Sequence, residues 1–154
     1  MLKDILFTFL ISFSPFGEAR VGIPYGIEHT DLTLIWVFLI ALSANLLVFP
    51  LFYRVIEFFN NHFLKSKWYR KAAIYLSLRA RRKTGAVVQK YGAIGLMIFV
   101  MIPLPFTGAY IGTIAAYIFK IDYKKGLLAI NIGVLIALTF IILVWPLILS
   151  LIHI

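Results

Sequence analysis

An eight-residue motif occurs twice in this chain, 90 positions apart, and it constrains the fold more than any other feature. Pro15–Gly22 has the sequence PFGEARVG and Pro105–Gly112 has PFTGAYIG, so four of the eight paired positions are identical. Each copy interrupts an apolar stretch with helix-breaking residues, a pattern typical of a transporter site at the interface of two structural repeats. The first copy carries Glu18 and Arg20, whereas the second has uncharged residues there. We therefore expect the two halves to contribute different chemistry to one site.

The composition indicates an integral membrane protein. Hydrophobic residues make up 62% of the 154 residues, charged residues make up 14%, and the mean hydropathy is +0.98. A single soluble core cannot bury so much apolar surface. No signal-peptide cleavage pattern follows the first apolar run, so we expect the N-terminus to belong to the mature fold. With no cysteine and three widely separated histidines, the sequence predicts no disulfide, no metal site and no cofactor.

The whole net charge of +9 lies in one central segment. Residues 54–90 hold ten Lys or Arg and a single acid, Glu57, while the charges outside this segment sum to zero. A basic run of this kind also occurs in nucleic-acid-binding proteins. In so apolar a chain, however, the positive-inside rule explains it better, and we expect no nucleic-acid partner. The sequence therefore places this segment in the cytoplasm.

Two apolar stretches, about Leu32–Phe52 and Gly126–Ile152, are long enough to span a bilayer, because ~20 helical residues cover ~30 Å of hydrocarbon. The other apolar stretches are arms of about ten residues, which reach only about half as far. They form two pairs, each pair separated by one copy of the motif, and we predict two re-entrant helical hairpins. The alternative, in which every arm crosses the bilayer, gives six very short spans. The residues assigned to the hairpin tips are Pro15, Gly17, Pro24, Pro103 and Pro105.

The predicted fold is an all-α polytopic membrane protein with one membrane domain, residues 1–154. Repeat one covers residues 1–53, a basic linker covers 54–91, and repeat two covers 92–154; each repeat is one re-entrant hairpin and one transmembrane helix. If each hairpin returns to its own side, the repeats have inverted topology, with both termini and the acidic loop 28–31 outside the cell. Non-helical backbone at membrane depth must be enclosed by protein or by a water-filled cavity, so we expect the two tips to face each other.

The linker carries aromatic residues at roughly helical spacing, with Lys and Arg between them. This pattern predicts one or two amphipathic interfacial helices whose basic face binds the anionic headgroups of membrane lipids. The alternative is a solvated connector whose charges only fix the topology.

Glu18 and Arg20 are the ionisable residues that lie within the hydrophobic segments and away from their ends. Charges inside a membrane are costly, so they are functional candidates by default. We assign Arg20 to substrate binding, because a guanidinium can fork onto a phosphate or a carboxylate. Glu18 is assigned to substrate binding and to proton coupling, because desolvation favours a neutral carboxyl group whereas a nearby arginine favours a charged one. The alternative is a structural ion pair that closes the tip.

A half-helix that begins near Gly108 would point free N–H groups into the protein, where they could bind an anionic headgroup. Gly108 and Ala109 are therefore further substrate-binding candidates, together with Thr107, which could instead be a plain helix cap. Asn45 and Asn131 lie inside the two long spans, where each amide could satisfy the freed backbone of a hairpin tip or bond a neighbouring helix.

Small residues follow both tips, with glycines at positions 22 and 26 and at positions 108 and 112. This spacing lets another helix approach closely. Pro50 and Pro146, near the ends of the long spans, are interpreted as kinks or helix terminators.

The two motifs resemble those of a known family. Residues 18–27, EARVGIPYGI, resemble the E-x-R-x-x-I-P-x-G-I signature of the small multidrug export proteins, and residues 102–110, IPLPFTGAY, resemble their second signature, I-P-L-P-G-T-G-A-[WY]. That family is similar to the DedA (VTT-domain) superfamily of membrane transporters. The resemblance implies two re-entrant hairpins carrying acidic and arginine residues, and the flipping of polyprenyl phosphate or phospholipids. Two departures stand out: Phe106 replaces the usual glycine, and residues 93–119 contain no counterpart of the superfamily's second-hairpin arginines.

Three functions remain open from the sequence. The first is a flippase-like or scramblase-like carrier of an anionic amphiphile, such as polyprenyl phosphate or a phospholipid, with possible proton coupling. The second is proton-coupled export of cationic lipophilic drugs, which requires Glu18 to be free of Arg20. The third is a non-transporting membrane scaffold whose linker docks anionic lipid. An enzyme is not expected, because the sequence shows no nucleophile–base pair, and a homo-oligomer is compatible with all three functions.

Overall fold

The computed structural model describes residues 2–63, 66–102 and 108–152, and the regular elements in these ranges are all helices. The all-α class is thus confirmed. The tip candidates Pro103 and Pro105, and the candidate cap Thr107, lie outside the described residues. The elements in chain order are α1 (Leu2–Phe13), α2 (Glu18–His29), α3 (Leu34–Phe63), α4 (Lys67–Met101), α5 (Ala109–Ile118) and α6 (Tyr123–Ile152).

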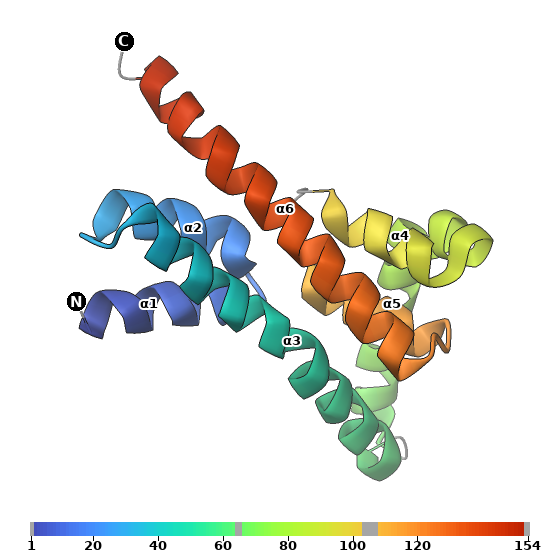
Figure 1. The fold of residues 1–154 in the computed structure, drawn as a ribbon. Coiled ribbons are helices and arrows are strands. Elements are labelled where there is room, and N and C mark those ends of the chain that lie inside the picture. Colours follow the sequence, from blue (N-terminus) through green and yellow to red (C-terminus); the bar gives the residue numbers. More distant parts are fainter. Residues whose placement is uncertain (1, 64–65, 103–107, 153–154) are drawn as a thin grey trace.

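The two long helices, α3 and α6, pack against each other in the middle of the molecule (Figure 1). On one side, α1 and α2 pack against each other and against α3, and on the other side α4 and α5 pack against each other and against α6. Contacts also cross between these groups, because α5 touches α3 and α2 touches α6. Along the chain, α1 and α2 are therefore followed by the long helix α3, and the last part of α4 together with α5 is followed by the long helix α6.

Two of the described helices are long and apolar enough to cross a membrane, Leu34–Phe63 and the Tyr123–Ile148 part of α6. The sequence predicts both, but it places the end of the first too early. That helix continues through Pro50 into the segment assigned to the linker, and α6 likewise continues through Pro146. Neither proline ends its helix, since packing between α3 and α6 can hold a helix that has lost one backbone hydrogen bond.

The helices α1, α2 and α5 are too short to cross a bilayer alone. The helices α1 and α2 have 12 residues each and α5 has 10, so each is about 15–18 Å long and cannot span ~30 Å of hydrocarbon alone. The tip between α1 and α2 is the turn at residues 14–17. Pro24 is not part of it, and its assignment to the tip was wrong, because it lies inside α2, where α1 and α3 pack around the helix.

The helix α4 changes direction at Gly92, where φ is 57° and ψ is −129°. Glycine adopts this left-handed backbone conformation without the cost that a Cβ brings. The chain then turns back so closely that a Cβ on Gly95 would lie 2.2 Å from the carbonyl oxygen of Val87. The bend separates the basic first part of α4 from its apolar last part, which pairs with α5 as the second set of short arms.

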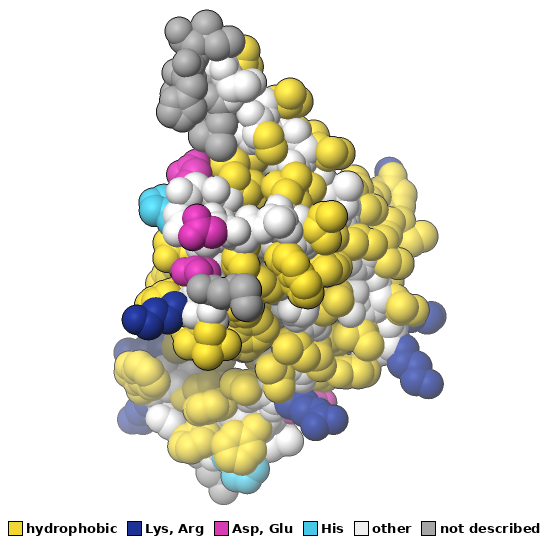
Figure 2. All heavy atoms as spheres, turned by 60° about the vertical axis from the view of Figure 1, so that its left-hand side comes forward, with side chains coloured by type: hydrophobic (Ala, Val, Ile, Leu, Met, Phe, Trp, Pro, Cys, Tyr) yellow, Lys and Arg dark blue, Asp and Glu magenta, His cyan; other side chains and the backbone are white. Residues whose placement is uncertain are grey.

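Apolar side chains cover much of the surface (Figure 2). On α6, large exposed side chains recur along the helix at Leu128, Phe140, Leu143 and Leu147. On the face of the molecule that Figure 2 shows, Asp and Glu side chains gather in one part, and most Lys and Arg side chains lie away from that part. An apolar surface of this kind suits a hydrocarbon environment and agrees with a membrane protein.

Glycines bring α1 and α2 together. A Cβ on Gly22 would lie 1.9 Å from Oγ of Ser12 and 3.0 Å from its Cα, and a Cβ on Gly26 would lie 3.2 Å from Cγ2 of Thr8. Both partner side chains are fully buried. The small residues after the first tip are therefore explained by close helix packing, as the sequence predicts.

Replacing Gly22 with alanine is expected to lower the stability of the fold by about 1–3 kcal/mol, because the backbone of α1 must move away from the new methyl group. Gly85→Ala is the matched control, since no described atom outside the adjacent turns of α4 lies within 4 Å of the position that its Cβ would occupy. Alanine there should stabilise α4 by about 0.5–1 kcal/mol. Thermal unfolding in detergent measures both, and equal shifts in the two variants would contradict the packing argument.

Candidate functional site

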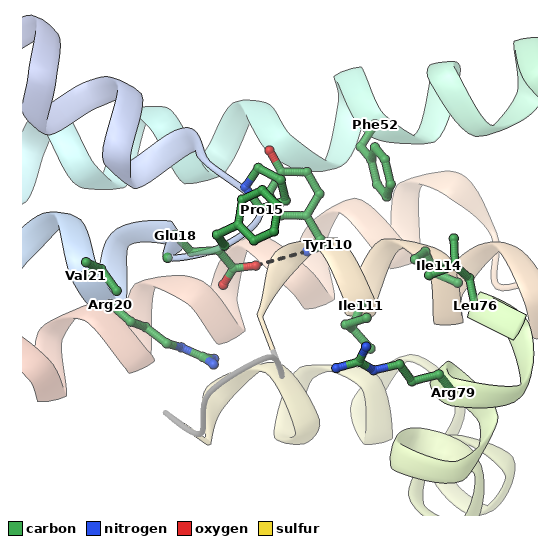
Figure 3. A pocket seen from close by; sticks show the side chains of 12 residues that line it. Pro15, Glu18, Arg20, Val21, Phe52, Leu76, Arg79, Tyr110, Ile111 and Ile114 are labelled. Carbon is green, nitrogen blue, oxygen red and sulfur yellow. Dashed lines mark hydrogen bonds between the residues drawn. The ribbon is translucent and has the colours of Figure 1, made fainter. Parts of the chain in front are cut away.

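The Glu18 side chain reaches from the first tip to the beginning of α5. Its Oε1 accepts a hydrogen bond of 3.3 Å from the backbone N–H of Tyr110, drawn as a dashed line in Figure 3. Its Oε2 lies over Gly108, where a Cβ would be only 1.4 Å away. The first tip therefore faces the start of α5, while residues 103–107 of the second tip lie outside the described residues. Glu18 has a φ of 53°, a conformation that costs a side-chain-bearing residue about 1–3 kcal/mol, so surrounding contacts must hold it there.

This contact places a negative charge at the positive end of a helix. The free N–H groups and the macrodipole at the start of α5 favour an anion, and the carboxylate of Glu18 supplies it. The sequence assigned Gly108 and Ala109 to a bound headgroup. In the structure these two residues face the protein's own carboxylate, and Ala109 is fully buried.

Arg20 contacts the other end of the interrupted helix. Its Nη2 donates hydrogen bonds of 3.3 Å to the carbonyl oxygens of Val100 and Ile102, at the end of α4. The last carbonyls of a helix carry partial negative charge and lack partners within the helix. Glu18 and Arg20 thus hold the two ends of the second tip, each with the charge that the helix end favours.

Tyr110 makes the reciprocal contact. Its hydroxyl group donates a hydrogen bond to the carbonyl oxygen of Phe13, the last residue of α1. Positions 20 and 110 are paired in the repeated motif, and each side chain bonds the end of the first arm in the opposite hairpin. The sequence analysis did not select Tyr110 as a site residue. The available signal was that Tyr110 occupies the same position in the second copy of the motif as Arg20 does in the first.

The asparagines of the two long helices, Asn45 and Asn131, differ in their contacts. Nδ2 of Asn45 donates hydrogen bonds of 2.9 Å to the carbonyl oxygen of Ser12 and 3.2 Å to that of Ala41, so this amide contacts the end of α1. Oδ1 of Asn131 is buried and has no hydrogen-bond partner among the described residues. The contribution of both residues to function stays a prediction.

A cavity of about 610 Å³ opens beside the charged tip. The first tip, α3, α4 and α5 all contribute to its walls, and Figure 3 shows Arg20 and Arg79 extending into it from different helices. Arg79 belongs to the linker, and the sequence analysis did not select it as a site residue. The available signal was its position one helical turn after Tyr75 and Leu76, the last residues of the aromatic pattern in that helix. The residues that line the cavity are Pro15, Phe16, Gly17, Glu18, Arg20, Val21, Phe52, Leu76, Arg79, Tyr110, Ile111 and Ile114.

Residues 18–140 match the sequence profile of the family described as Putative small multi-drug export protein. This chain belongs to that family. The matched range begins at Glu18 and includes the second motif, Arg79, all of α3 and the first part of α6, so it covers most of the cavity wall. Comparisons with curated proteins and with solved structures gave no match.

The family description agrees with the structure at the level of a membrane transporter. Two apolar helices in the described part of the chain can span a bilayer, and a cavity lies beside one of them, α3, with α2, α4 and α5 completing its walls. Among the described residues, no group of three or more His, Cys, Asp or Glu is placed to hold a metal ion. The small multi-drug export family is described by an export activity, not by a chemical reaction.

Proposed function

We propose that this small multi-drug export family member carries an anionic amphiphile, such as a polyprenyl phosphate or a phospholipid, across the membrane through the cavity beside its charged tip. The observation that supports the proposal most directly is the presence of Arg20 and Arg79 in one cavity whose other walls are mostly apolar. Guanidinium groups bind phosphate oxygens through paired hydrogen bonds, and apolar walls accept the adjoining hydrocarbon.

The size of the cavity limits what it holds. About 610 Å³ lies within the range of ~300–1,000 Å³ typical of small-molecule sites. It accommodates a headgroup and the first part of a chain, while the rest of a long isoprenoid or acyl chain would stay in the lipid. The proposed carrier therefore moves the polar end of the substrate and leaves the apolar end in the membrane.

Export of a cationic lipophilic drug is the second candidate, because Glu18 also lines the cavity and the family description names drugs. A cation site needs that carboxylate to be available. In the structure its Oε1 accepts the N–H of Tyr110, and two arginines share the cavity with it. Two positive charges and an already bonded carboxylate favour an anionic substrate.

The proposal is tested in proteoliposomes with two probes, a labelled polyprenyl phosphate and a lipophilic quaternary ammonium dye. We expect transport of the first, and we expect Arg79→Gln to lower its rate at least about tenfold, as the loss of one charge-assisted hydrogen bond predicts. Transport of the dye alone, with dependence on Glu18, would replace the proposal by drug export. Transport of neither probe by folded protein would favour a scaffold.

The membrane layout is part of the proposal. We place the basic linker in the cytoplasm and both termini outside, with the short arms as re-entrant hairpins in inverted repeats. The support is the short length of α1, α2 and α5 and the concentration of positive charge on residues 54–90. Single cysteines in this cysteine-free chain test it: a cysteine near position 83 should resist labelling by an impermeant reagent from outside intact cells, and labelling there would overturn the layout.

A further inference from the structure

A second hollow lies on α4, next to the central cavity. It has a volume of about 350 Å³ and is lined by Tyr75, Leu78, Arg79 and Arg82. Arg79 also lines the central cavity, so this one side chain belongs to both. The hollow therefore adjoins the central cavity at Arg79.

The helix places these four residues on one face. Positions 75, 78, 79 and 82 are three or four residues apart, so their side chains neighbour one another on the surface of α4. Leu76, next to Tyr75 in sequence, is turned toward the central cavity, which Figure 3 shows for Leu76 and Arg79. The helix therefore separates the two spaces, with Arg79 at their common border.

The chemistry of the hollow suits a phosphate-bearing headgroup. Two guanidinium groups, those of Arg79 and Arg82, lie one helical turn apart, and none of the described residues that line the hollow is acidic. Tyr75 is 63% exposed and Leu78 is 53% exposed, so an apolar surface lies directly beside the charges. A soluble phosphate needs no such surface, whereas an amphiphile does.

We propose that this hollow is an access site, where the phosphate-bearing headgroup of a membrane amphiphile binds between Arg79 and Arg82 before it enters the central cavity. The inference rests on the proposed function, because it names the place from which that cavity is loaded. The amphiphile comes from the leaflet in which α4 lies, with its chain along Tyr75 and Leu78. Arg82 then raises the occupancy of the carrier without touching the substrate inside it.

The site can be tested by photocrosslinking, which does not require transport. A benzophenone amino acid replaces Leu78 in the full-length chain, and the purified protein is placed in vesicles that contain labelled polyprenyl phosphate. We expect crosslinking at this position, and we expect Arg82→Gln to lower it at least about tenfold. A benzophenone at Ile74, which is equally exposed on α4 but lines neither space, is the positional control.

Arg70→Gln is the charge control, because Arg70 is exposed on the same helix and lines neither the hollow nor the central cavity. It should leave crosslinking at position 78 unchanged. Equal losses in the Arg70 and Arg82 variants would reduce the effect to the general charge of α4 and overturn the site. Inorganic phosphate is the last arm: it should not compete at millimolar concentration, and full competition would identify a soluble phosphate ligand and overturn the amphiphile.

The failure of the access site and the failure of the carrier are separable. If polyprenyl phosphate is transported but position 78 gives no crosslink, the access site is wrong and the proposed function stands. If position 78 crosslinks in an Arg82-dependent way while no transport occurs, the site stands as a lipid-binding site and the carrier is wrong.

Discussion

Gly108→Ala is expected to abolish transport and to lower the stability of the fold by about 3–5 kcal/mol, the cost of separating a buried charge from its partners. The new Cβ would lie 1.4 Å from Oε2 and 2.1 Å from Cδ of Glu18, so the carboxylate must leave the start of α5. Glu18 is only 9% exposed, and water cannot easily replace the lost contacts. The backbone of Gly108 has a φ of −80° and a ψ of −157°, which alanine adopts readily, so the expected effect is steric.

A double-mutant cycle isolates this cause. Glu18→Ala alone should also be strongly destabilising, but the two changes together should cost little more than Glu18→Ala by itself, because the clash needs both side chains. Thermal stability in detergent provides the measurement, with Gly85→Ala as the control for adding a methyl group to a helix. Costs that simply add would mean that alanine at position 108 disturbs something other than Glu18.

The architecture was predictable where it depends on length and composition. Ten or so apolar residues on either side of Pro15 and of Pro105 cannot cross a bilayer, and the lengths of α1, α2 and α5 follow from that pattern. The expectation that the tips face each other needs only the cost of unpaired backbone in lipid, and the closeness of Glu18 to Gly108 agrees with it for the described residues.

The boundaries of the long helices were less predictable. The sequence placed the first span at about Leu32–Phe52 and the linker from residue 54, and it interpreted Pro50 as a kink or a helix terminator because a proline removes one backbone hydrogen bond. The helix continues because its neighbours hold it, with Phe49 and Tyr53 packed around Pro50 against Tyr123 of α6. A local sequence pattern contains no information about such contacts.

The partners in the site could not be predicted at all. The sequence shows two opposite charges two residues apart, and it left a structural ion pair between them open as an alternative to a functional role. In the structure Glu18 also accepts the N–H of Tyr110, and Arg20 bonds the carbonyl oxygens of Val100 and Ile102, contacts that lie 80 to 92 residues away along the chain. Arg79 was missed for a related reason, since only the fold brings the linker helix beside the first tip.

Two conservative changes should separate transport from stability at this tip. Glu18→Gln keeps the side-chain volume and an oxygen that can accept the N–H of Tyr110, so the fold should lose no more than about 1 kcal/mol, the value of a charge at a helix end. It removes the exchangeable proton and the negative charge from the cavity. If Glu18 couples transport to protons, the rate for labelled polyprenyl phosphate should fall at least about tenfold.

Arg20→Lys keeps the positive charge but removes the guanidinium fork that bonds the carbonyl oxygens of Val100 and Ile102 and faces the cavity. An ammonium group cannot bind a phosphate through two parallel hydrogen bonds, so transport should fall more than thermal stability does. Arg70→Lys is the matched control, because that arginine lines neither the central cavity nor the hollow on α4, and it should change neither quantity. Glu18→Gln and Arg20→Lys are both measured for thermal unfolding and for transport per folded protein, beside the control. Lost stability with normal transport by the surviving folded fraction would show that Glu18 and Arg20 only hold the second hairpin in place.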